Sequence, residues 1–83
     1  MHNEILIKFE NHDGGLAGFI EDEKISPLIS STADTEEEFI ANFRMLLKDF
    51  QEHEYKNDPY LGNLNIDEVV FKLERMGPEY YED

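Results

Sequence analysis

Alternating apolar and polar residues near the start of the chain predict a β-strand with one buried face. Two alternating sets occupy residues 5–10, with Ile5, Ile7 and Phe9 on one face and Leu6, Lys8 and Glu10 on the other. This period of two is typical of a half-buried strand. Residues 11–15, NHDGG, tolerate positive φ, and residues 16–21 then resume an extended, apolar pattern. The sequence therefore predicts a β-hairpin.

A third, shorter strand is predicted after the hairpin. Residues 21–24, EDEK, are all charged and form a polar break, after which residues 25–32 are extended in pattern. Pro27 confines the start of this strand to a sheet edge or a bulge, because proline has no backbone N–H to donate.

The start of a helix is the clearest local signal in the chain. Asp34 or Thr35 provides a cap for free backbone N–H groups, and Glu38, three residues after Thr35, completes a capping box. Glu36 and Glu37 join Glu38 near the positive end of the helix dipole, where each carboxylate contributes a few tenths to about 1 kcal/mol. The apolar residues that follow form one stripe at helical spacing: Phe39, Ile40, Phe43, Leu46, Leu47 and Phe50. We expect this stripe to pack against the hairpin.

The last third of the chain fits two structures. Residues 53–65 contain Asn, Asp, Pro and Gly and are predicted to form a surface loop. Residues 65–76 fit a helix that Asn65 caps and Gly77 ends. They also fit a strand, in which the inward set is Val69, Phe71 and Leu73. We favour the strand, because a helix leaves Phe71 on its polar side and the sheet with only three strands.

The predicted fold class is therefore α+β, with a three- to four-stranded antiparallel sheet packed on one amphipathic helix in the order β-β-β-α-β. A chain of 83 residues fits one domain with a small core. We assign residues 1–76 to this domain and residues 77–83, GPEYYED, to an acidic, aromatic tail.

Charge narrows the choice of partner. The chain has 20 acidic and 7 basic residues, a formal net charge of −13. Nucleic acid is a poor partner because phosphate contacts need clustered Lys and Arg, and the basic residues here are scattered. A basic protein surface fits this negative field better, although ordinary solubility also accounts for the acidic surplus. An exposed strand edge would also allow self-association into a homo-oligomer.

No residue pattern points to catalysis, a cofactor or a metal. The absence of cysteine excludes disulfides and thiolate chemistry. His2, His12 and His53 are scattered without metal-ligand spacing. The Asp13–Gly15 turn lacks the Lys and the hydroxyl residue of a phosphate loop. Paired carboxylates lie at predicted turns and caps, where solvation and the helix dipole account for them. We therefore expect no enzyme activity, no catalytic residues, no metal and no cofactor.

No segment approaches the roughly 20 apolar residues that span a bilayer, and the first residues lack the apolar core of a secretory signal. We expect a cytoplasmic protein without a membrane partner.

Three segments resemble the HicB-type antitoxin fold. They are DGG at residues 13–15, LAGFIED at 16–22 and TADTEEEF at 32–39, which resemble the family's D-G-G-Y and G-D-T-x-E-E-A patterns in order and spacing. The matching positions of the second pattern are Asp34, Thr35, Glu37 and Glu38, whereas Ala33, Glu36 and Phe39 replace its usual Gly, Leu and small residue. The resemblance covers about residues 4–73.

This resemblance implies a strand-strand-strand-helix-strand unit, similar to part of an RNase H sheet, that masks the active site of a small basic mRNA-cleaving toxin. Family members often add a C-terminal DNA-binding segment. Only GPEYYED follows Met76, so we expect toxin masking without operator binding.

We therefore predict an acidic module that masks a basic partner protein, of the HicB-like antitoxin type. One alternative is a phage or mobile-element inhibitor that imitates nucleic-acid charge to block a defence enzyme, and another is an orphan structural domain. Copurification of a small basic toxin-like chain would favour the antitoxin. Competition with DNA or RNA for a larger nucleic-acid-processing enzyme would favour the mimic of nucleic acid. The absence of any partner at low salt would favour the orphan domain. The candidate contact residues are Glu36, Glu37, Asp49, Glu52, Tyr80 and Tyr81.

Overall fold

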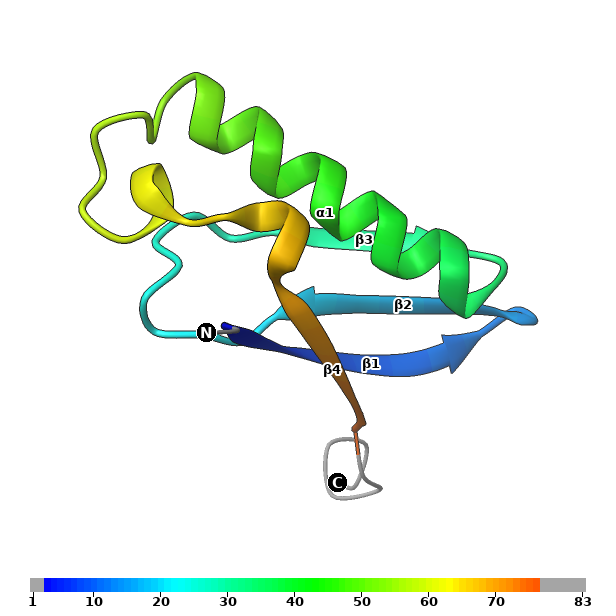
Figure 1. Cartoon of the computed structure of the whole chain (residues 1–83). Coiled ribbons are helices and arrows are strands. Elements are labelled where there is room, and N and C mark those ends of the chain that lie inside the picture. Colours follow the sequence, from blue (N-terminus) through cyan, green and yellow to red (C-terminus); the bar gives the residue numbers. More distant parts are fainter. Residues whose placement is uncertain (1–2, 77–83) are drawn as a thin grey trace.

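The computed structural model describes residues 3–76 as one sheet covered by one helix (Figure 1). The strands are β1 (Glu4–His12), β2 (Gly15–Ile20), β3 (Ser30–Ala33) and β4 (Val70–Arg75), and the helix is α1 (Glu36–Glu52). Two single-turn 3-10 helices, η1 (Leu61–Asn63) and η2 (Ile66–Glu68), lie between α1 and β4. The predicted α+β class and the order β-β-β-α-β are confirmed. In the described part of the chain, α1 and the two short helices are too short or too polar to cross a membrane.

The sheet is mixed, with strand order β3-β2-β1-β4. The pairs β1–β2 and β2–β3 are antiparallel, as predicted, but β4 runs parallel to β1. The expectation of a wholly antiparallel sheet is therefore wrong for its last strand. A parallel neighbour needs a long crossover, and α1 with the segment after it supplies one. This connection carries the chain over one sheet face from β3 at one edge to β4 at the other (Figure 1).

The predicted hairpin joins β1 and β2 through a two-residue turn. Asp13 and Gly14 have φ of 52° and 81°, and the flanking residues His12 and Gly15 are paired. Positive φ at both central positions is the geometry that suits the right-handed twist of a hairpin, and Asp-Gly is a favoured sequence for it.

Thr35 is the N-cap of α1, one of the two residues predicted for this role. Its Oγ1 accepts the backbone N–H of Glu38 at 3.2 Å. In return, Glu38 Oε1 accepts the backbone N–H of Asp34 at 3.3 Å. The reciprocal bond thus reaches one residue further back than in the usual capping box.

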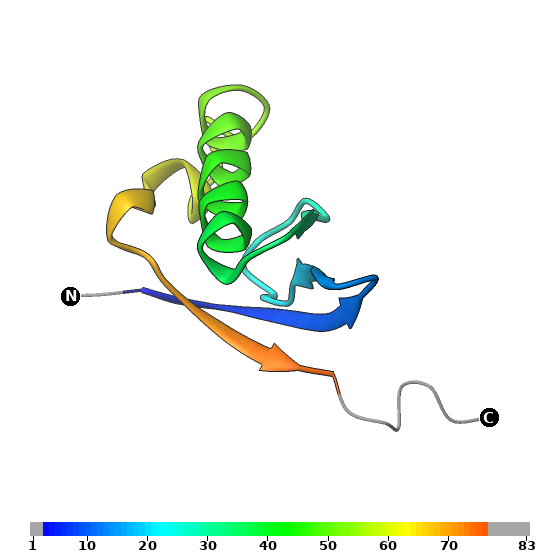
Figure 2. The same ribbon diagram turned by 90° about the vertical axis from the view of Figure 1, so that its right-hand side faces the viewer.

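The core lies between α1 and the inner sheet face. Phe39, Phe43 and Leu47 of α1 have no exposed surface, and neither have Ile5 and Ile7 of β1. The rings of Phe39 and Phe43 meet edge to face, with centroids 4.9 Å apart. Among residues 3–76, the opposite face of the sheet has no covering layer (Figure 2).

Close packing of α1 on the sheet depends on Gly18 in β2. A Cβ at this position would lie 2.2 Å from the backbone oxygen of Lys8 and 3.0 Å from Cζ of Phe39. The absence of a side chain therefore lets the Phe39 ring approach the sheet backbone.

Three segments can now be compared with their predictions. The third strand begins at Ser30, later than predicted, and Ile25 and Ile29 reach the core from the connection before it. Residues 53–65, predicted as a surface loop, contain η1 and bury Leu61 and Leu64. Over residues 65–76 the favoured strand is confirmed as β4, and helical structure is limited to the single turn η2.

Candidate partner-binding surface

The side of α1 that points away from the core combines an apolar centre with acidic ends. At about 100° per residue, positions opposite the buried stripe form one band along the helix. We define this α1 outer face by six of its exposed residues: Glu37, Ala41, Met45, Lys48, Asp49 and Glu52. Met45 is 63% exposed near the middle of the helix. An exposed apolar residue within a polar rim is the general arrangement of a protein contact surface.

The basic residues of α1 bind the chain's own backbone or carboxylates. Arg44 Nη1 donates to the carbonyls of Ile66 at 2.6 Å and Val69 at 3.2 Å, and its guanidinium lies 5.0 Å from the Phe71 ring centroid. Lys48 Nζ lies 2.7 Å from Asp67 Oδ1, and this ammonium group lowers the pKa of the Asp67 carboxyl. These contacts tie α1 to the segment around η2.

The same pattern holds for other basic residues. Lys8 is paired with Glu74, Lys24 lies over the Tyr60 ring, and Arg75 contacts both Asn11 and the Phe9 ring. Together with Arg44 and Lys48, five of the seven basic side chains contact groups of their own chain. The field presented to a partner is therefore dominated by carboxylates.

Asp49 and Glu52 lie at the negative end of the α1 dipole, where carboxylates weaken a helix rather than support it. The last turn of α1 contains no basic residue. His53, which follows it, partly offsets this charge: its Nδ1 lies 2.8 Å from the carbonyl oxygen of Asp49 and 3.4 Å from Oδ1 of the same residue. The hydrogen bond to that carbonyl, and then the Asp49 carboxylate, raise the pKa of the exposed His53 above 6.5.

Protonated His53 is expected to stabilise the end of α1 only at low pH. Because its folded-state pKa is raised, the stabilisation is complete below about pH 6.5 and is lost as pH rises through the folded value. In thermal unfolding scans, His53→Gln should lower the midpoint at about pH 5.5 and have no effect at about pH 8.5. An equal loss at both pH values would contradict the assignment of the stabilising role to the charged imidazole.

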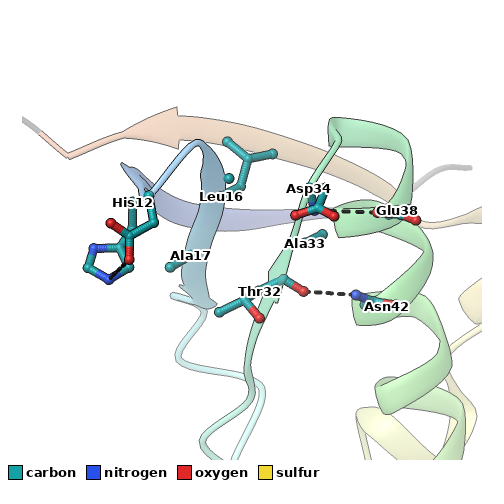
Figure 3. Close-up of a pocket in the computed structure, with 10 residues that line it drawn as sticks. His12, Leu16, Ala17, Thr32, Ala33, Asp34, Glu38 and Asn42 are labelled. Atoms are coloured by element: carbon teal, nitrogen blue, oxygen red, sulfur yellow. Dashed lines mark hydrogen bonds and ion pairs between the residues drawn. The ribbon is translucent and has the colours of Figure 1, made fainter.

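A hollow lies where the β1–β2 turn approaches the N-terminus of α1 (Figure 3). Its volume is about 570 Å³, and carboxylates of Asp13, Asp34 and Glu38 line it. Asn42 Nδ2 donates to the carbonyl of Thr32 at 3.1 Å along its wall. Asp34 and Glu38 extend the negative charge of the α1 outer face onto the turn end of the molecule.

The structure brings three of the predicted contact residues onto one surface. Glu37, Asp49 and Glu52 belong to the α1 outer face, although Glu37 and Glu52 are about 22 Å apart along the helix. Glu36 is exposed but lies on the side of α1 that carries the buried stripe, one turn before Phe39 and Ile40. Tyr80 and Tyr81 lie outside the described residues.

The prediction missed Met45, although the helical spacing that identified the buried stripe also places Met45 opposite to it. It also missed Arg44 and Gln51, whose partners are backbone carbonyls distant in sequence. No local pattern reveals such partners.

The described residues contain no group of three or more His, Cys, Asp or Glu side chains placed to hold a metal ion. Beside the carboxylates, the side chains of His12, Thr32 and Asn42 also line the hollow in Figure 3.

No protein-family model matches the chain, and no curated protein matches it in sequence. Among solved structures, the fold is similar to that of an antitoxin assigned to a toxin/antitoxin system of Syntrophomonas wolfei subsp. wolfei, with a TM-score of 0.54. The two chains are 18% identical, and the match covers 86% of this chain and 64% of the other. This similarity confirms an antitoxin-like fold and does not distinguish the HicB type.

Proposed function

We propose that this chain is a non-enzymatic binding module of the antitoxin kind, which masks a basic partner protein with the α1 outer face. The observation that carries this proposal is the charge distribution. Basic side chains of α1 are held by the chain itself, whereas Glu37, Asp49 and Glu52 are exposed around Met45.

The arrangement suits a protein partner more than a small ligand. Met45 and Ala41 provide an apolar centre that a partner side chain can cover, and the flanking carboxylates steer a basic surface toward it. Asp49 and Glu52 are unfavourable for the helix, because they face the negative end of its dipole. Helix stability therefore does not explain them, whereas contact with a basic surface would.

The fold similarity to an antitoxin supports the same proposal. In the HicB-like form of the hypothesis, the partner is a small basic toxin whose active site α1 covers. Tyr80 and Tyr81 of the acidic tail would add aromatic anchors to this contact. A toxin that cleaves mRNA acts in the cytoplasm, so this proposal also places the module there. The negative field opposes direct binding to nucleic acid.

Charge reversal on the α1 outer face is expected to weaken partner binding. In affinity purification of the tagged chain, the double variant E37K/E52K should retain roughly tenfold less of a basic partner than the wild type, since two attractive ion pairs become repulsive. The matched control is E21K/E23K, which makes the same change in net charge at exposed positions of the β2–β3 connection. Binding should also fall as salt rises from about 50 to 500 mM.

Several outcomes separate the alternatives. A small basic chain that depends on Glu37 and Glu52 supports the proposal. A larger enzyme released by added DNA or RNA indicates a nucleic-acid mimic instead. Equal loss in both double variants, or binding that is indifferent to salt, contradicts a contact at α1. No retained protein at low salt indicates an orphan domain.

A further inference from the structure

The two edges of the sheet differ in how open they are. β3 has only four residues, and Asn42 of α1 binds its Thr32 carbonyl. β4 has six residues, and within residues 3–76 no strand lies beyond it in the order β3-β2-β1-β4. The far side of β4 is the open edge in Figures 1 and 2.

The backbone groups at the open edge of β4 belong to alternate residues. The N–H groups of Val70 and Met76 donate to Asn3 and Phe9, at 2.8 Å each, and therefore point toward β1. Because backbone direction alternates along a strand, the N–H groups of Lys72 and Glu74 also point toward β1. The N–H and C=O groups of Phe71, Leu73 and Arg75 then face outward, which is the row of groups that another strand can pair with.

We propose that a second copy of this chain pairs with β4 in antiparallel orientation, with a two-fold axis at Leu73. Outward backbone groups belong only to odd-numbered residues, so an antiparallel self-pairing must match odd residues with odd ones. This condition leaves three central registers, which place residue 72, 73 or 74 opposite its own copy. The first opposes two Lys72 and the third opposes two Glu74, and like charges directly opposite each other are destabilising.

The register centred on Leu73 is complementary along its whole length. On the uncovered sheet face it places Lys72 opposite Glu74 of the second copy, twice by symmetry. The same face pairs Val70 with Met76 of the second copy, which gives a partner to Val70, an apolar side chain that is 46% exposed. On the helix-facing side it places Leu73 opposite Leu73 of the second copy, and Phe71 opposite Arg75.

The side chains of Lys72 and Glu74 at this edge are exposed. A hollow of about 500 Å³, lined by Leu6 of β1 and by Lys72, Leu73 and Glu74 of β4, lies beside them. Lys72 is exposed, and Glu74 has a side chain that is 55% exposed while it pairs with Lys8. Glu74 can therefore also accept a contact from outside the chain. The two sheets would join into one continuous sheet of two copies.

Salt distinguishes this contact from binding to a basic partner. Two chains of charge −13 repel each other, and the Debye length falls from about 10 Å at 0.1 M to about 3 Å at 1 M salt. The two exposed Lys72–Glu74 pairs offset only part of this repulsion. Self-association should therefore strengthen as salt rises, whereas binding to a basic protein should weaken.

Charge swapping tests the register in sedimentation experiments on the full chain. Lys72→Glu places two Glu–Glu pairs in the interface, and Glu74→Lys places two Lys–Lys pairs there. Each variant alone should dimerise about tenfold or more weakly than the wild type, because two pairs change sign. An equal mixture of the two variants should form a heterodimer, because every pair between different chains is then Glu–Lys.

The matched controls are Lys56→Glu and Glu54→Lys, at exposed positions after α1. They should dimerise as the wild type does, and circular dichroism confirms that all variants are folded. A wild-type chain that stays monomeric at high salt up to about 100 μM overturns the proposal. The proposal is also overturned if Lys72→Glu and Glu74→Lys dimerise as strongly as their controls. It is overturned as well if the equal mixture of these two variants fails to associate. No partner protein enters this test, so its result leaves the proposed function untouched.

Discussion

Replacing Phe43 by Ala is expected to lower the free energy of unfolding by about 3–5 kcal/mol. Phe43 has no exposed surface, and its ring meets Phe39 edge to face at the centre of the contact between α1 and the sheet. The truncation removes buried apolar surface and leaves a cavity among residues that cannot all move inward. A domain of this size has a total stability of only about 4–12 kcal/mol. The loss is therefore about a quarter or more of that stability, and all of it at the lower end of the range.

Urea unfolding followed by far-UV circular dichroism measures this loss. The matched control is Met45→Ala, which truncates a long apolar side chain of the same helix at a position that is 63% exposed. Its effect should stay within about 0.5 kcal/mol. Equal losses in the two variants would mean that the α1 stripe is not the core of the folded protein.

Local sequence rules predicted the elements whose geometry is decided by near neighbours. The period of two over residues 5–10 identified β1, because one face of that strand is buried and the other is not. Asp13 and Gly14 identified the hairpin through their tolerance of positive φ. Asp34, Thr35 and Glu38 located the start of α1 to within one residue, because each cap bond joins residues at most four positions apart.

The same rules could not predict how distant segments meet. The direction of β4 depends on the crossover that precedes it, and nothing within Val70–Arg75 records that path. Residues 53–65 have the composition of a loop, yet Gln51 Nε2 donates to the carbonyls of Leu61 and Leu64 at 2.9 and 2.7 Å and fixes their backbone against α1. Tertiary contacts bury these two leucines, and the polar residues beside them in the sequence give no sign of it.

The candidate site was predictable to a similar extent. Helical spacing places Glu37, Asp49 and Glu52 away from the core, and the same spacing identifies Met45. Which charges remain available to a partner depends on the internal contacts of Arg44 and Lys48. Composition reports the net charge, whereas the fold decides on which surface it appears.

Arg44→Ala is expected to produce the second largest loss of stability, about 2–4 kcal/mol. The variant removes two charge-assisted hydrogen bonds, a class with a net contribution of about 1.5–3 kcal/mol each. Because both come from the same Nη1 of a partly exposed side chain, we expect their joint contribution to lie at the lower end of that range. It also removes a cation–π contact with Phe71 worth about 0.5–1 kcal/mol. The carbonyls of Ile66 and Val69, which accept those bonds at part-buried positions, would have to find water instead.

Two further variants separate the geometry of Arg44 from its charge. Arg44→Lys keeps the charge but replaces the planar group with one ammonium, so it should recover only part of the loss. Lys48→Ala removes the neighbouring ion pair with Asp67, whose side chains are 46% and 69% exposed, and should cost at most about 1 kcal/mol. In urea unfolding, Arg44→Ala should therefore lose the most free energy of unfolding among the three variants. Equal losses for Arg44→Ala and Lys48→Ala would contradict the stabilising role of the contacts between Arg44 and the two carbonyls. Because Arg44 holds the turn that leads into β4, its loss should also increase amide exchange at Val70 and Lys72, whose N–H groups point toward β1, before global unfolding. That local effect would link the packing of α1 to the order of the open sheet edge.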